Sequence, residues 1–136
     1  MTTFIPNPET IRSLRILTLE DDQEFSSVLK SHLEHHGHSV TAVPNGSEGL
    51  KLIMQEDFDV IICDLMMPQV AGNMFYVAVE KSKPHLKDRF IFVTGFGSEP
   101  KVEQFLKSSG QKHLWKPFSP SDLLRTIDEV TRPRKA

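Results

Sequence analysis

Five short apolar runs, each followed by a stretch with helical periodicity, constrain the fold of this chain more than any other feature. The runs cover residues 16–19, 40–43, 60–63, 90–93 and 113–115. They are mostly continuous rather than alternating, which is typical of parallel strands covered by helices on both faces. The pattern therefore predicts an α/β domain with a doubly wound parallel sheet.

The segments between these runs carry helix signals. Phe25, Leu29 and Leu33 share one helical face, and Gly37 stands where that helix would end. Ser47 can cap a second helix, and apolar positions within 102–106 indicate a short helix after the fourth run. Ser119, which precedes a proline, marks the start of the last helix. Segment 73–83 also has strand propensity, but two parallel strands of one sheet need a crossover, so we predict a helix there. The (βα)5 pattern predicts a five-stranded sheet of flavodoxin-like order 2-1-3-4-5.

Length and composition limit the classes of function. The chain has 136 residues, enough for one domain with a substantial core, and we expect a leader at 1–13, a domain at 14–132 and a short basic tail at 133–136. The formal net charge of −2 gives no support for direct nucleic acid binding. No apolar run is long enough to span a bilayer, so we expect no membrane insertion and a cytoplasmic location. The single cysteine, Cys63, excludes an internal disulfide.

Four of the five predicted strands end in polar groups. Glu20 and Asp21 follow the first strand, Asp64 ends the third, Thr94 follows the fourth, and Lys116 follows the fifth. Open α/β sheets bind their ligands at this carboxyl edge, and in the predicted order the first and third strands flank the switch point. These side chains are therefore expected to form one site.

Three carboxylates at one edge repel one another unless a cation lies among them. Mg²⁺ binds through one or two carboxylates together with waters and phosphate oxygens. We expect Asp21 and Asp64 as direct ligands, with Glu20 close by or acting through water. An aspartate can also attack a phosphoryl group to form an acyl phosphate. The Lys116 ammonium and the Thr94 hydroxyl would then stabilise the phosphoryl oxygens.

These motifs resemble the receiver domain of two-component response regulators over about residues 15–130. The resemblance rests on the acidic run 20–22, on Asp64 with Pro68 and Gly72 after it, on Thr94-Gly95, and on 116–118. The spacings agree too, with 43 residues from Asp21 to Asp64, 30 on to Thr94 and 22 on to Lys116. Each motif alone is weak, whereas the ordered set is specific.

The resemblance implies that Asp64 accepts a phosphoryl group from a sensor histidine kinase or a histidine phosphotransfer protein. It implies Mg²⁺, with Mn²⁺ as an alternative ion, held by Glu20, Asp21, Asp64 and the backbone carbonyl of Met66. Thr94 and Lys116 would contact the phosphoryl group. Such a domain is a two-state signalling switch, and it is not an enzyme acting on an external substrate. Its last two helices would offer a homodimer surface.

Three positions differ from the usual pattern. His113 stands where the family has Tyr or Phe, so the switch pair here would be Thr94 and His113. Because histidine changes charge near neutral pH, we hypothesise pH-sensitive signalling or a reduced aromatic switch. Met66 and Phe96, which should flank the mouth of the site, are both apolar. We hypothesise that this pair excludes water and slows dephosphorylation.

Other interpretations remain open at this point. The chain could be a degenerate receiver that serves as a phosphorylation-independent scaffold. It could also be a phosphatase of the haloacid dehalogenase type, although that class needs an acid where Met66 stands. The acidic run could be a solvated loop in which Asp22 caps a helix. Trp115, Phe90 and Phe92 are expected in the core rather than in contact with a ligand. A metal role is disfavoured for four histidines, namely His32, His35, His36 and His38.

Overall fold

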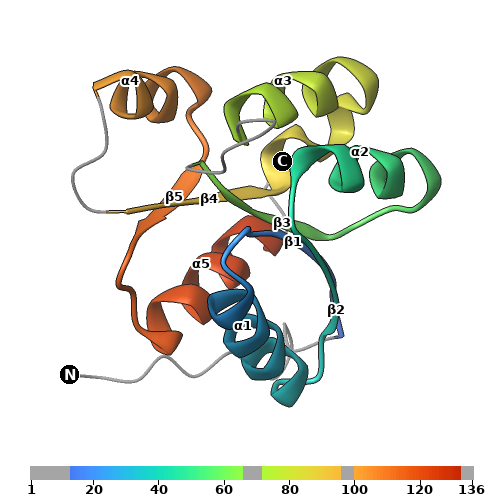
Figure 1. Ribbon diagram of the computed structural model, residues 1–136, viewed down its shortest axis with the longest axis vertical. Helices are drawn as coiled ribbons and strands as arrows, with labels where there is room; N and C mark the ends of the chain where they lie inside the picture. Colours follow the sequence, from blue (N-terminus) through green and yellow to red (C-terminus); the bar gives the residue numbers. More distant parts are fainter. Residues whose placement is uncertain (1–12, 66–71, 96–99, 133–136) are drawn as a thin grey trace.

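The computed structural model describes residues 13–65, 72–95 and 100–132, which form one parallel sheet with helices on both faces (Figure 1). The strands are β1 (Arg15–Leu19), β2 (Ser39–Val43), β3 (Val60–Asp64), β4 (Phe90–Thr94) and β5 (Lys112–Trp115). The helices are α1 (Gln23–His35), α2 (Gly46–Gln55), α3 (Gly72–Ser82), the 3-10 helix η1 (Pro84–Arg89), α4 (Pro100–Ser109) and α5 (Pro120–Thr131).

The five strands lie in the order β2-β1-β3-β4-β5, and every neighbouring pair is parallel. Helices α1 and α5 cover one face, and α2, α3 and α4 cover the other (Figure 1). The predicted (βα)5 fold and its strand order are confirmed. Segment 73–83, ambiguous by propensity, is helix α3, as the need for a crossover predicted.

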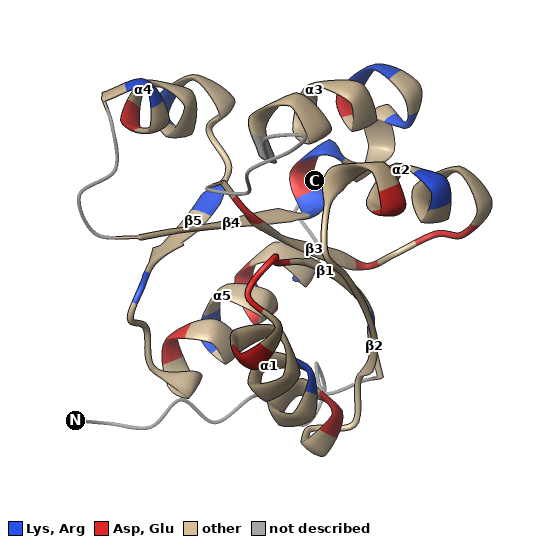
Figure 2. Ribbon diagram, in the orientation of Figure 1, with Lys and Arg blue, Asp and Glu red and all other residues tan. Residues whose placement is uncertain are grey.

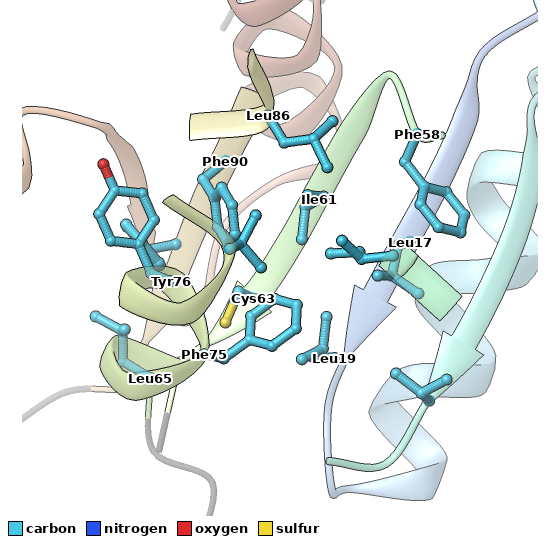
Figure 3. Close-up of a cluster of buried hydrophobic side chains, with 14 of the residues drawn as sticks. Leu17, Leu19, Phe58, Ile61, Cys63, Leu65, Phe75, Tyr76, Leu86 and Phe90 are labelled. Atoms are coloured by element: carbon cyan, nitrogen blue, oxygen red, sulfur yellow. The ribbon is translucent and has the colours of Figure 1, made fainter. Parts of the chain in front are cut away.

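Alternate strand residues supply two hydrophobic layers. In β3, Ile61 and Cys63 pack beneath α2, α3 and α4, whereas Val60 and Ile62 pack against α1 and α5. Figure 3 shows the first layer, where Phe75 from α3 lies close to Cys63 and Leu19. All residues of β3 and β4 are buried, which explains why their sequences are continuously apolar until the last position.

The helix starts agree with the expected caps except at α2. Asp22 accepts a hydrogen bond from the Phe25 amide at 3.1 Å and caps α1, and Ser119 caps α5. The Ser47 prediction was wrong: Asn45 caps α2 by accepting from the Glu48 amide at 3.0 Å. Ser47 is the second residue of this helix, so it does not occupy the N-cap position.

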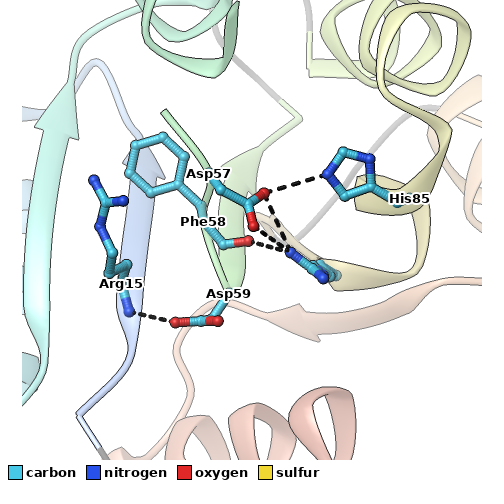
Figure 4. Close-up of polar contacts among 6 residues, drawn as sticks. Arg15, Asp57, Phe58, Asp59 and His85 are labelled. Atoms are coloured by element: carbon cyan, nitrogen blue, oxygen red, sulfur yellow. Dashed lines mark hydrogen bonds and ion pairs between the residues drawn. The ribbon is translucent and has the colours of Figure 1, made fainter. Parts of the chain in front are cut away.

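A polar network ties together the amino ends of the strands, opposite the predicted site (Figure 4). The Asp59 carboxylate accepts from the Arg15 amide at 2.8 Å. Arg89 donates to the Phe58 carbonyl at 2.8 Å and lies 3.4 Å from Asp57. These contacts fix the α2–β3 connection against β1 and η1.

The placement of Trp115 in the core was wrong, since the residue is 38% exposed, whereas Phe90 and Phe92 are buried as expected. Strand β5 pairs only with β4 and forms the edge of the sheet, so neighbouring elements cover it less completely than the central strands. No helix within the described ranges is both long and apolar enough to cross a bilayer.

Candidate functional site

The carboxyl edge of the sheet brings the predicted polar residues together because the strand ends are held in register. Leu19 pairs with Cys63, which places Glu20, the residue after β1, next to Asp64, the last residue of β3. The Lys116 amide donates to the Thr94 carbonyl at 2.8 Å, which fixes the start of the β5–α5 connection at the end of β4. Backbone pairing therefore sets the positions of the site residues.

Glu20, Asp21 and Asp64 form an acidic cluster with one oxygen from each carboxylate within 4.8 Å of the others. Glu20 and Asp64 are buried, at 4% and 5% exposure, whereas Asp21 is exposed. Figure 2 shows the acidic β1–α1 loop in red above the start of α1. The donor set is entirely carboxylate oxygen, open to solvent on the Asp21 side, and so fits a hard divalent cation such as Mg²⁺.

Lys116 supplies positive charge to this cluster. Its Nζ lies 2.6 Å from Glu20 Oε1 and 3.5 Å from Asp64 Oδ2. It also lies 4.2 Å from the centroid of the Phe25 ring. Burial lowers the pKa of Lys116, but the hydrogen bond to Glu20 and the charge of Asp64 outweigh it, so the net shift is upward. The ammonium is therefore charged at neutral pH.

Glu20 is a carboxyl group of the cluster whose pKa is clearly raised. Burial, followed by the hydrogen bond with Asp64, raises the pKa of Glu20 from 4.5 to about 8, although Lys116 acts in the opposite direction. A single lysine thus does not neutralise the buried carboxylates. Additional positive charge, from a proton or a metal ion, is favoured at this position.

The other predicted residues are placed as follows. Thr94 is completely buried at the end of β4. His113 is exposed on β5, outside the acidic cluster, with its ring centroid 6.1 Å from that of Trp115. Both side chains line a surface pocket of ≈ 340 Å³ beside α4. Met66 and Phe96 lie outside the described residues.

Sequence reasoning did not identify Phe25 as a residue of the site. Its position on the apolar face of α1 suggested only a core role. The available signal was its place three residues after the Asp22 cap, which puts it in the first helical turn at the ligand-binding edge of the sheet. His32 and His35 near the end of α1, and His36 and His38 before β2, form no group with metal-ligand geometry among the described residues.

Comparison with known proteins agrees with this geometry. The family model for the response regulator receiver domain matches residues 16–128. Response regulator SaeR of Staphylococcus epidermidis is 33% identical over 123 residues, which are 89% of this chain and 52% of that protein. SaeR of Staphylococcus aureus is 29% identical over 121 residues, 88% of this chain and 52% of that protein. The chain spans about half the length of these curated relatives.

Solved structures show the same fold. A CheY-like response regulator receiver domain protein from Methanospirillum hungatei is 30% identical with a TM-score of 0.79, covering 88% of this chain and 94% of that one. Response regulator TrrA from Thermotoga maritima, crystallised with Mg²⁺ and BeF, is 25% identical with a TM-score of 0.72 and coverage of 85% and 97%. Together with the strand order and the acidic cluster, these matches show that the chain belongs to the response regulator receiver domain family, whose members are phosphoacceptor switches of two-component signal transduction and not enzymes acting on an external substrate.

Proposed function

We propose that Asp64 accepts a phosphoryl group from a phosphohistidine on a sensor histidine kinase or a histidine phosphotransfer protein. The observation that carries this proposal is the Lys116 ammonium, which reaches both Asp64 and Glu20 within the acidic cluster. That arrangement presents a carboxylate nucleophile beside a fixed positive charge. The family match over residues 16–128 supports the same role.

Phosphoryl transfer to Asp64 forms a bond from one carboxylate oxygen to phosphorus while the bond from phosphorus to the donor's imidazole nitrogen breaks. The chain supplies positioning and charge rather than acid–base chemistry. Lys116 neutralises negative charge on the phosphoryl oxygens, and the hydroxyl of Thr94 donates a hydrogen bond to one of them. Buried surroundings strengthen both interactions because Asp64 and Thr94 are shielded from water.

Glu20, Asp21, Asp64 and the backbone carbonyl of Met66 would hold Mg²⁺, with Mn²⁺ as an alternative ion. When bound, the ion neutralises charge on the carboxylates and on the incoming phosphoryl group. The all-oxygen donor set and the raised pKa of Glu20 support this assignment. The presence of Mg²⁺ in the TrrA structure supports it by analogy.

Thr94 and His113 would couple phosphorylation to the surface formed by α4, β5 and α5. This proposal rests on family resemblance, as does a homodimer formed through the last two helices. His113 already lies at that surface, beside the pocket next to α4. A cytoplasmic location and the boundaries 1–13, 14–132 and 133–136 also remain predictions.

The test uses the whole chain with acetyl phosphate or beryllofluoride and Mg²⁺, followed by amide NMR spectra. We expect shifts around Asp64 and at the α4–β5–α5 surface in the wild type, and none in Asp64→Asn. Unchanged spectra in the wild type would instead favour a scaffold that acts without phosphorylation. Multiple turnovers of p-nitrophenyl phosphate would favour the phosphatase alternative.

A further inference from the structure

The aromatic ring of Phe25 lies against the ammonium of Lys116, the lysine that contacts the acidic cluster. The distance from Nζ to the ring centroid is 4.2 Å, within the range of an attractive cation–π contact. We propose that Phe25 is a positioning residue that holds Lys116 beside Asp64 during phosphoryl transfer. This inference rests on the proposed function of Asp64.

The ring is well placed to act in this way because two contacts fix it. The backbone amide of Phe25 donates to Asp22 at 3.1 Å, which anchors the residue in the first turn of α1. The ring of Phe118 meets it edge to face, with centroids 5.9 Å apart and an interplanar angle of 89°. Phe25 is therefore held between the start of α1 and the segment that carries Lys116.

The contacts of Lys116 show why its ammonium needs the Phe25 ring to stay beside Asp64. Its shortest contact is with Glu20 at 2.6 Å, while Asp64 is 3.5 Å away. A Glu20 carboxylate engaged in binding Mg²⁺ has less negative charge to offer the lysine. Asp64 and the Phe25 ring are the other contacts that the described residues give the ammonium.

A long side chain that is 27% exposed can rotate into water when its ion pair weakens. The ring opposes this movement because its face attracts a cation, and more strongly where water is partly excluded. Lys116 then stays within reach of the Asp64 oxygen that receives the phosphoryl group. Phe25 itself touches no reacting atom.

The test compares three variants at saturating Mg²⁺ with acetyl phosphate as donor and the acyl phosphate measured by intact mass. Phe25→Leu removes the ring face and keeps an apolar side chain. Phe25→Tyr keeps an aromatic face. The matched control is Phe58→Leu, which makes the same exchange where Arg15 lies 5.4 Å from a ring at the other end of β1.

We expect Phe25→Leu to lower the maximal phosphorylation rate about three- to tenfold, from the usual strength of cation–π contacts. The Mg²⁺ concentration for half-maximal rate should remain unchanged, and Phe25→Tyr and Phe58→Leu should keep the wild-type rate. Equal rates in Phe25→Leu and the wild type would overturn the inference, as would an equal loss in Phe25→Tyr. A wild-type chain that takes up no phosphoryl group would instead reject the proposed function. Circular dichroism confirms that each variant is folded.

A double-mutant cycle with Lys116→Gln separates this role from general packing. If Phe25 acts through the lysine, Phe25→Leu should have no further effect on the rate once Lys116 is replaced. The same fold loss in both backgrounds would show that the ring acts on packing alone.

Discussion

Glu20→Gln should stabilise the protein at alkaline pH in the absence of metal. Glu20 is 4% exposed, and its carboxylate lies within 4.8 Å of oxygens of Asp21 and Asp64. Two like charges at such a distance repel by about 3 kcal/mol at an effective dielectric constant of about 20. The ion pair with Lys116 offsets part of this repulsion, but burial and Asp64 still raise the pKa of Glu20 from 4.5 to about 8.

The raised pKa fixes the direction of the pH effect. The folded protein binds the Glu20 proton more tightly than the unfolded chain does. The resulting contribution to the free energy of unfolding is fully present below pH 4.5 and is lost as the pH rises through about 8. The difference between the two pKa values limits this contribution to the free energy of unfolding to about 5 kcal/mol. We expect about 2–3 kcal/mol, because neighbouring charges readjust when Glu20 ionises.

Urea unfolding in EDTA, followed by the fluorescence of Trp115, the single tryptophan, measures this contribution. The difference in unfolding free energy between Glu20→Gln and the wild type should grow from about pH 5 to about pH 9. Mg²⁺ should stabilise the wild type more than Glu20→Gln, since it replaces the lost proton as the source of positive charge. Asp21→Asn is the matched control, because it removes an exposed carboxylate of the same cluster and should alter the pH profile less. Parallel pH profiles for the wild type and Glu20→Gln would refute the electrostatic reasoning.

Three further substitutions test packing and polar contacts away from the cluster. Gly49→Ala should lower the free energy of unfolding by about 1–3 kcal/mol in thermal melts, because its Cβ would lie 3.0 Å from the Phe75 ring; an unchanged melting temperature would contradict this. His38→Gln should make the free energy of unfolding fall less steeply at acid pH. Burial and a neighbouring histidine lower the pKa of His38 in the folded protein. Its contribution to the free energy of unfolding is therefore present above about pH 6.5 and is lost as the pH falls, because the unfolded chain binds the proton more readily. An equally steep loss in the variant would argue against that assignment. Arg89→Gln should cost about 1 kcal/mol in urea unfolding through loss of its 2.8 Å bond to Phe58, with no change in phosphorylation rate.

The sheet could be predicted from sequence because its signals are redundant. Central strands buried on both faces must be continuously apolar, and parallel neighbours need crossovers, so the ambiguous segment became helix α3. The same logic placed Glu20, Asp64, Thr94 and Lys116 at the carboxyl edge of one sheet. Backbone pairing between the parallel strands then brings these residues to neighbouring positions, and this does not depend on how the side chains of the core pack.

Features that depend on side-chain packing were not predictable in this way. Asn45 and Ser47 are both competent caps, and only the observed start of α2 decides between them. The exposure of Trp115 depends on how far neighbouring elements cover the edge strand. The contact between Phe25 and Lys116 joins two segments far apart in sequence. Neither residue type predicts such a contact from the sequence alone.

Chemical mapping of the phosphoryl group shows directly whether Asp64 is the phosphoacceptor. The protein is incubated with acetyl phosphate and Mg²⁺, the acyl phosphate is reduced with borohydride, and the modified residue is located by tandem mass spectrometry of peptides. We expect reduction at Asp64 alone, and this labelling should depend on Mg²⁺ and be weaker in Lys116→Gln. Modification at Glu20 or Asp21 instead, or labelling that persists unchanged in Asp64→Asn, would contradict it.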